Sequence, residues 1–252
     1  MSKKDALFNY CLRLGDNSLI LSQRLSEWCG HAPILEEDLA LTNIALDLIG
    51  QAREFLTYAG DIEGKGRTED TLAYHRDAKD FRNLLLVEQP NGNFAHTTVR
   101  QFFFSAYAFH LYSALKASKD ENIGAFAAKS LKEVTYHLRH SSEWMLRLGD
   151  GTEESRKHIL TAIDDLWMYT GELFENSELD EALINEGIAV DASVLHELWN
   201  ETVQGIFHRI NLPLPQEGYM LKGGIKGVHT EHLGHLLAEM QFLPRAYPDA
   251  KW

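Results

Sequence analysis

Apolar side chains in this chain of 252 residues recur mainly at spacings of three and four, which is the periodicity of amphipathic α-helices. A bundle must bury such stripes against one another, so they constrain the fold more than any other feature. The first stripe begins at Leu7 and has Ser18 as its only polar position. The longest stripes predict helices over residues 7–28, 34–60, 94–117 and 122–148.

The rest of the chain reads as shorter helices and loops. Thr152, with Ser155 near it, is a plausible N-cap for a fifth helix. Strand-like alternation is confined to Ile188–Val190, and there is no repeat or low-complexity linker. Shorter elements are expected as one or two helices within 61–93, helices over 178–186, 192–210 and 231–243, and a loop over 211–229. We predict one all-α domain over 1–252, an antiparallel helix bundle with additional C-terminal helices.

Composition excludes several classes of protein. The net charge of −13 disfavours a nucleic-acid binder, which needs a basic face. No apolar run approaches the roughly 20 residues that span a bilayer, and the N-terminus lacks an apolar signal region. Cys11 and Cys29 fall at opposite ends of one predicted helix, too far apart for a disulfide. We expect a cytoplasmic protein with buried, reduced thiols and no membrane contact.

Long bundle helices of this kind hold iron in carboxylate proteins through Glu-x-x-His pairs. None of the twelve histidines has Glu or Asp three residues before it. The segment KEVTYHLRH has Val134 where the acid would stand before His137. A bundle without these ligands indicates a protein that supports chemistry carried out elsewhere.

Two groups of residues could still bind a metal. Glu133, His137 and His140 share one helix face, although a polar helix flank explains them more simply. In GVHTEHLGHLLAEMQ, His229 precedes a face formed by His232, His235 and Glu239. A zinc or iron site is geometrically possible there, but the pattern is not His-Glu-x-x-His and no fourth ligand is visible. A surface or interface helix start explains it equally well.

Two further features bear on binding. Lys222 and Lys226 flank a glycine turn that could contact a phosphate, a carboxylate or a partner loop, though a plain flexible turn is the simpler interpretation. Aromatic residues between Phe102 and Phe109 surround the third long helix on more than one face. Part of that aromatic surface could therefore meet another subunit.

Several segments carry a specific resemblance. They are YCLRLGDNSLILSQRLSEWCGHAP, DLALTNIALDLIGQAR, LLLVEQPNGNFA, EVTYHLRHSSEW, NEGIAVD and GVHTEHLGHLLAEMQ. Together they resemble, nearly end to end, the structural, non-catalytic subunits of bacterial phenylacetyl-CoA epoxidase. This ring 1,2-epoxidase is a multicomponent oxygenase of aerobic phenylacetate degradation.

The resemblance implies a ferritin-like fold and a set of partners. It implies pairing with a catalytic subunit that holds the di-iron centre and binds the thioester. It also implies a small bridging subunit and a reductase that carries FAD and an iron–sulfur centre and takes electrons from NADPH. The chain itself would bind no cofactor, and a homodimer is possible in isolation.

The resemblance also places the iron-ligand positions of the catalytic relative on this sequence. On the second helix they fall on Leu48 and Gln51, and on the fourth they fall on Val134 and His137. The third-helix carboxylate falls near Ser105. The first-helix position stays open among Ser22, Gln23 and Ser26. Only His137 keeps a side chain that can bind iron.

The leading hypothesis is thus a non-catalytic scaffold that pairs with and stabilises the di-iron subunit. One alternative is a metal-dependent enzyme that uses His229, His232 and His235. Another is a free-standing homo-oligomeric helical protein. Contact of Lys222, Lys226, His229 or His232 with a partner or with substrate stays open.

Overall fold

The computed structural model describes residues 2–215, 218–248 and 250. Across these ranges it contains eleven α-helices and four short 3-10 helices, and no strand. The all-α prediction is confirmed, whereas the strand-like alternation at 188–190 forms no strand. The backbone divides into two compact units, Met1–Gln89 with Gly223–Trp252, and Pro90–Lys222. The prediction of a single domain stays a prediction.

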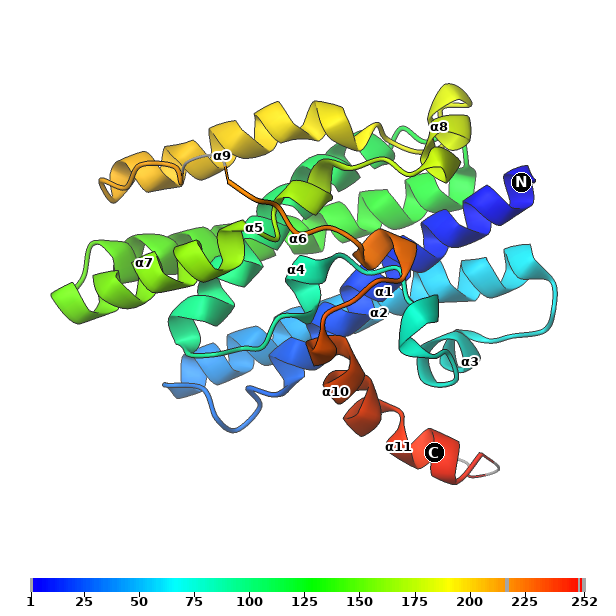
Figure 1. Ribbon diagram of the computed structural model, residues 1–252, viewed down its shortest axis with the longest axis horizontal. Coiled ribbons are helices and arrows are strands. Elements are labelled where there is room, and N and C mark those ends of the chain that lie inside the picture. Colours follow the sequence, from blue (N-terminus) through cyan, green and yellow to red (C-terminus); the bar gives the residue numbers. More distant parts are fainter. Residues whose placement is uncertain (1, 216–217, 249, 251–252) are drawn as a thin grey trace. The chain divides into compact units, whose positions relative to one another are not determined.

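The first unit is built on a hairpin of two long helices, α1 (Lys3–Ser26) and α2 (Leu35–Glu63), which run antiparallel (Figure 1). Ser2 and Asp5 form a capping box at the start of α1. Helix α2 ends at Glu63 and is capped by Gly64, whose positive φ of 68° suits glycine. The apolar stripes predicted for both helices are buried, from Cys11 to Leu25 in α1 and from Leu41 to Ala59 in α2.

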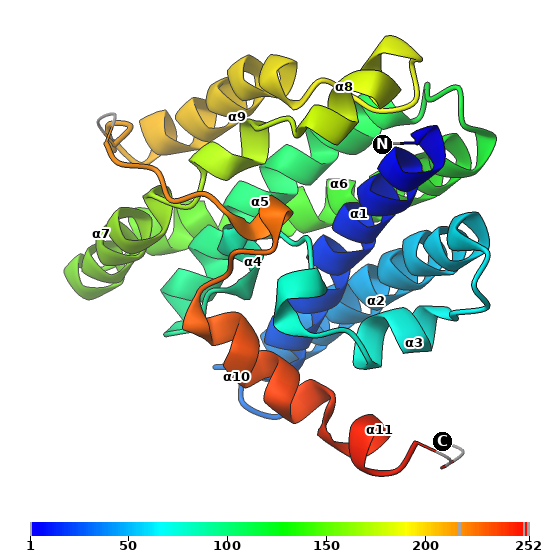
Figure 2. The same cartoon turned by 45° about the vertical axis from the view of Figure 1, so that its right-hand side comes forward.

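Shorter elements complete the first unit (Figure 2). They are α3 (Glu69–Tyr74), η1 (Ala78–Asp80), α4 (Leu85–Glu88), η4 (Gly224–Lys226), α10 (Glu231–Met240) and α11 (Phe242–Ala246). The sequence predicts one helix over 231–243, but α10 ends at Met240 and the backbone turns at Gln241. The Gln241 side chain donates to the carbonyl oxygens of Ala73 and Arg76, at 2.9 and 3.0 Å, which fixes this turn.

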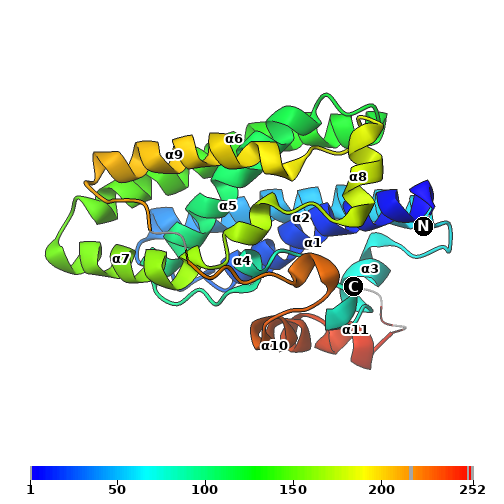
Figure 3. The ribbon, with the colours of Figure 1, turned by 45° about the horizontal axis from the view of Figure 1, so that its top comes forward.

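The second unit pairs α5 (Phe94–Leu115) with α6 (Glu121–Gly149), and α7 (Glu153–Trp167) and α9 (Leu195–Arg209) pack on this pair (Figure 3). The smaller elements are η2 (Gly171–Phe174), α8 (Glu178–Asn185) and η3 (Ala192–Val194). Helix α7 begins with the expected cap, since Thr152 and Ser155 form a capping box.

An aromatic core holds α5, α7 and α9 together. The Phe103 ring lies 5.6 Å from the rings of both Trp167 and Trp199. Trp199 is buried, and its indole N–H donates to the Phe103 carbonyl oxygen at 2.9 Å. Phe102 and Phe104 are buried as well, and Phe109 is half-buried. Most of the aromatic run therefore packs within the chain instead of offering a surface to a partner.

Two further expectations can be compared with the structure. Cys11 is buried as predicted, but Cys29 is exposed, because α1 ends at Ser26 and Cys29 lies in the turn that follows. Within the described ranges, no helix is both long enough and apolar enough to cross a membrane.

Candidate functional site

The predicted iron-ligand positions of the first unit lie inside the α1–α2 hairpin. Leu48 has no exposed surface, and Gln51 is 2% exposed. The Ser18 hydroxyl of α1 lies 3.5 Å from Oε1 of Gln51. Ser22 is also buried, and its hydroxyl donates to the Leu19 carbonyl oxygen at 2.7 Å. This part of the hairpin interior therefore holds an apolar side chain, an amide and serine hydroxyls.

The corresponding positions of the second unit lie on α5 and α6. Ser105, Val134 and His137 are each 1% exposed. The Gln101 side-chain amide donates to the Ser105 hydroxyl at 2.9 Å, so the hydrogen-bond partner of Ser105 comes from its own helix, α5. His137 is thus a deeply buried histidine.

These side chains do not fit a di-iron centre. Two iron cations in a low-dielectric interior need several carboxylates to balance their charge. Leu48 and Val134 offer no donor atom, while Gln51 and Ser105 carry no negative charge. Among the described residues, no group of three or more His, Cys, Asp or Glu side chains could hold a metal ion. This applies to the Glu133, His137 and His140 group as well.

In the C-terminal histidine group, His229 is bound by a buried carboxylate, that of Glu88. Glu88 is fully buried, and its Oε1 accepts from the backbone N–H and the hydroxyl of Thr230, at 2.7 and 2.8 Å. Its Oε2 lies 2.8 Å from both the Asn83 side-chain nitrogen and Nδ1 of His229. Nε2 of His229 faces the Phe81 carbonyl oxygen at 3.2 Å. Both ring nitrogens of His229 are therefore already engaged.

The other members of that group serve different purposes. The backbone carbonyl of His232 accepts from Arg24 at 3.2 Å, whereas His235 is exposed. Arg24 also donates twice to the Glu88 carbonyl oxygen, at 2.8 and 3.1 Å. The structure thus gives no support to a metal site at these three residues. His229 contacts Glu88 of α4, the His232 carbonyl accepts from Arg24 of α1, and His235 is exposed.

A second buried ion pair strengthens the same unit. Asp16 of α1 has no exposed surface and is paired with Arg76, which is 4% exposed. The Asp16 carboxylate also accepts from the backbone N–H of Arg82 at 2.8 Å. The Arg76 guanidinium lies over the Phe81 ring, 4.2 Å from its centroid. We call Asp16 and Glu88, together with the residues that bind their carboxylates, the acidic junction. It fixes the segment between α3 and α4.

The glycine turn near Lys222 and Lys226 has a defined packing role. A Cβ atom on Gly224 would lie 2.2 Å from the Asn83 carbonyl oxygen, and one on Gly227 would lie 2.2 Å from that of Lys79. Only glycine allows these close backbone approaches. The interpretation as a plain flexible turn is therefore wrong. Lys226 is exposed, and Lys222, the last residue of the second unit, forms an ion pair with Glu175 of that same unit.

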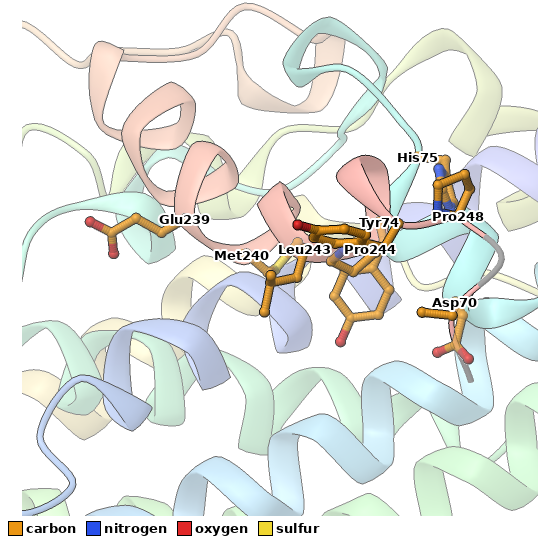
Figure 4. Close-up of a pocket in the computed structure, with 10 residues that line it drawn as sticks. Asp70, Tyr74, His75, Glu239, Met240, Leu243, Pro244 and Pro248 are labelled. Atoms are coloured by element: carbon orange, nitrogen blue, oxygen red, sulfur yellow. The ribbon is translucent and has the colours of Figure 1, made fainter. Parts of the chain in front are cut away.

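A pocket with a volume of about 540 Å³ lies elsewhere in the first unit (Figure 4). Asp70 and Tyr74 line one side, and Met240 and Leu243 contribute to the other. Burial, and then the nearby Asp70 carboxylate, raise the pKa of Tyr74, so its phenol stays neutral at physiological pH. Of the residues singled out from the sequence, Glu239 alone lines this pocket, and Figure 4 shows its carboxylate directed away from Tyr74.

Sequence reasoning missed the acidic junction. Glu88 stands in an irregular stretch before a proline, and its partners lie 141 and 142 residues further along the chain. No local pattern relates such positions. The useful signal was the buried apolar run LLLVE, which indicates that the glutamate at its end is carried into the interior.

Comparison with known proteins gives one consistent result. The family described as phenylacetic acid catabolic protein matches residues 1–252. The chain is also 54% identical over 243 residues to a protein of Escherichia coli strain K12 that is named as one of the subunits of 1,2-phenylacetyl-CoA epoxidase, and the match covers 96% of this chain and 98% of that protein. The predicted resemblance and the ferritin-like, all-α fold class are thereby confirmed. This chain belongs to the phenylacetic acid catabolic protein family.

Proposed function

We propose that this chain is a non-catalytic structural subunit of a phenylacetyl-CoA epoxidase and acts in aerobic phenylacetate degradation. The observation that carries the proposal is the 54% identity, over nearly the full length of both chains, to a protein named as a subunit of that enzyme. The proposed role is to pair with and stabilise a di-iron catalytic subunit.

The chemistry of the interior supports a non-catalytic role. A chain that holds two iron ions needs acids at the helix positions where this one has Leu48, Val134 and Ser105. We therefore place the iron in the catalytic subunit. The electrons would come from NADPH through a reductase with FAD and an iron–sulfur centre, and a small further subunit would bridge the pairs.

The acidic junction supports a scaffold role in physical terms. Two fully buried carboxylates, Asp16 and Glu88, bring together segments that are distant in sequence. Removing one partner of such a buried pair strongly destabilises a protein, so each pair specifies one arrangement of the helices it joins. A subunit that stabilises its partner by binding benefits from such a preorganised interior, because less ordering is then needed on association.

Iron analysis of the purified chain, alone and with the catalytic subunit, tests the proposal. We expect the isolated chain to retain far less than one iron per chain after reconstitution and to show no epoxidation. The two-subunit complex should retain the iron of its catalytic partner. Stoichiometric di-iron together with turnover by the isolated chain would overturn the proposal. Failure to co-elute with a co-expressed catalytic subunit would instead favour a free-standing homo-oligomer.

A further inference from the structure

The pocket in Figure 4 has two chemically different walls. Helix α3 contributes Asp70, Tyr74 and His75, whereas Met240 of α10 and Leu243 of α11 contribute apolar surface on the other side. Its volume of about 540 Å³ lies within the range of about 300–1,000 Å³ that is typical of small-molecule sites. All of its described lining residues belong to the first unit. The pocket can therefore be considered within that unit alone.

Two polar groups of the α3 wall have no protein partner. The Asp70 carboxylate and the Tyr74 hydroxyl form no hydrogen bond or ion pair with any of the residues that the structure describes. Burial, and then the Asp70 carboxylate, raise the pKa of Tyr74. Its phenol is therefore neutral and can both donate and accept a hydrogen bond. A ligand in the pocket would thus meet one negative charge and one hydroxyl on the same wall.

The arginines that reach α3 are engaged with other acids. Nε of Arg53 lies 3.5 Å from the Glu69 carboxylate, and Arg245 donates to the Asp77 carboxylate at 3.1 Å. Among the described residues that line the pocket, none is a lysine or an arginine. These residues therefore leave the negative charge of Asp70 without a balancing cation inside the pocket.

This combination of groups favours an organic cation with an aliphatic stem. A carboxylate such as Asp70 accepts strong, charge-assisted hydrogen bonds from an ammonium group. The rings of Tyr74 and Tyr247, which both line the pocket, add the attraction of aromatic rings for cations. Met240 and Leu243 provide apolar surface for methylene groups. The net charge of −13 also raises the local concentration of cations around the chain.

Other classes of ligand fit the pocket less well. An anion would meet the carboxylates of Asp70 and Glu239, and like charges oppose association. A wholly apolar molecule would remove the Asp70 carboxylate and the Tyr74 hydroxyl from water and give them no hydrogen bond in return. A metal ion lacks ligands, because no group of three suitable side chains occurs in the described part of the chain.

We infer that the pocket between α3 and α11 binds an alkylammonium group, with the Asp70 carboxylate as its anionic contact. Two sources share this chemistry, a small aliphatic amine and a lysine side chain of another protein. The inference goes beyond the proposed function and does not depend on it, since it assigns a binding site to this chain itself.

The test follows the Met240 methyl group by NMR in the full chain labelled with ¹³C-methyl methionine. The sequence has five methionines, and Met240→Leu identifies the signal of Met240 by its loss. The probe is n-butylammonium at pH 8, where alkylammonium ions keep their charge and ordinary histidines are neutral. We expect the Met240 signal to shift with a Kd in the millimolar range, as suits a ligand of so few atoms. Neutral n-butanol and anionic butyrate should bind at least several-fold more weakly.

Two aspartate variants test the role of charge. Asp70→Asn keeps the shape of the side chain and removes its charge, so it should weaken binding of n-butylammonium several-fold. Asp61→Asn changes an exposed aspartate of α2 that does not line the pocket, and should bind like the wild type. Both variants should keep the wild-type melting temperature, because both side chains are exposed. Added salt should weaken binding to the wild type, because it screens the ion pair.

The inference is overturned if n-butylammonium leaves the Met240 signal unmoved, if n-butanol binds equally well, or if Asp70→Asn binds as tightly as the wild type. Repeating the titration on the complex with the other epoxidase subunits distinguishes the two sources. A Met240 signal that is already shifted and no longer responds identifies a lysine of a partner, whereas an unchanged response identifies a free amine. If no complex forms, the proposed function fails, while the result for the isolated chain still decides the pocket.

Discussion

The acidic junction and the predicted iron-ligand positions are equally buried but chemically opposite. Asp16 and Glu88 have no exposed surface and carry carboxylates, while Leu48 and Val134 are as deeply buried and carry none. At the junction, the chain itself supplies the donors, among them Arg76 for Asp16 and Thr230 for Glu88. At the junction, buried acids have hydrogen-bond donors from the chain itself. At the predicted ligand positions, where a metal would have to balance the charge of buried acids, the chain has apolar side chains instead.

This difference follows from the cost of burying charge. A carboxylate removed from water without partners is strongly destabilising, and hydrogen bonds or a cation must offset that cost. A metal offsets it only when bound. With Leu48 and Val134 at these positions, the interior needs no ion to be stable. The comparison can be tested from both sides, by removing a partner at the junction and by adding an acid at a ligand position.

Arg76→Ala should produce the largest effect. It leaves Asp16 buried without its cation, and breaking such a pair costs about 3–5 kcal/mol in the free energy of unfolding. Urea unfolding of the isolated chain measures this value. The control is Arg139→Ala, whose partner Glu143 lies 4.0 Å away with both side chains exposed, and it should cost less than about 1 kcal/mol. Equal effects of the two substitutions would contradict the comparison.

Val134→Glu adds an acid at a predicted ligand position and should destabilise the chain by about 3 kcal/mol at neutral pH. Because protonation removes the buried charge, the destabilisation should shrink as pH falls toward 4. Added Fe²⁺ should not rescue stability, since His137 would be the only other ligand-capable side chain among the five positions.

Val134→Gln is the matched control for this substitution, because it has nearly the same shape without a titratable group. Its effect on the free energy of unfolding should not vary with pH in the same range. If Val134→Glu shows no more pH dependence than Val134→Gln, the carboxylate is reaching solvent or a cation, and the contrast between the two regions is lost.

The helices could be read from the sequence because they depend on local spacing. The periodicity from Leu7 onward and the cap at Thr152 predict α1 and the start of α7 within a few residues. The break at Gln241 was missed, because it depends on side-chain hydrogen bonds to Ala73 and Arg76, more than 160 residues earlier. Such a contact is set by the fold and leaves no local signal.

The candidate site shows the same division. Burial of Leu48 and Val134 follows from their places on apolar stripes, and the sequence predicts it. The engagement of His229 with Glu88 could not be predicted, because a histidine three residues before another reads equally as a ligand or as a helix cap. What decided between them was a carboxylate from another part of the chain.

His110 provides an intermediate case, a half-buried titratable group whose partner is neutral. Its Nε2 lies 2.8 Å from the Thr202 hydroxyl, and burial lowers its pKa from the ordinary 6.5, partly opposed by Glu201. The unfolded chain therefore takes up a proton on this histidine at a higher pH than the folded chain does. The stability that the neutral His110 contributes is present above about pH 6.5 and is lost as pH falls through the folded pKa. His110→Gln should therefore flatten the fall in the free energy of unfolding between about pH 7 and pH 5, by less than about 1 kcal/mol. Thermal or urea unfolding at several pH values measures the slope, and a steeper acid loss in the variant would show that His110 is stabilised in its charged form instead.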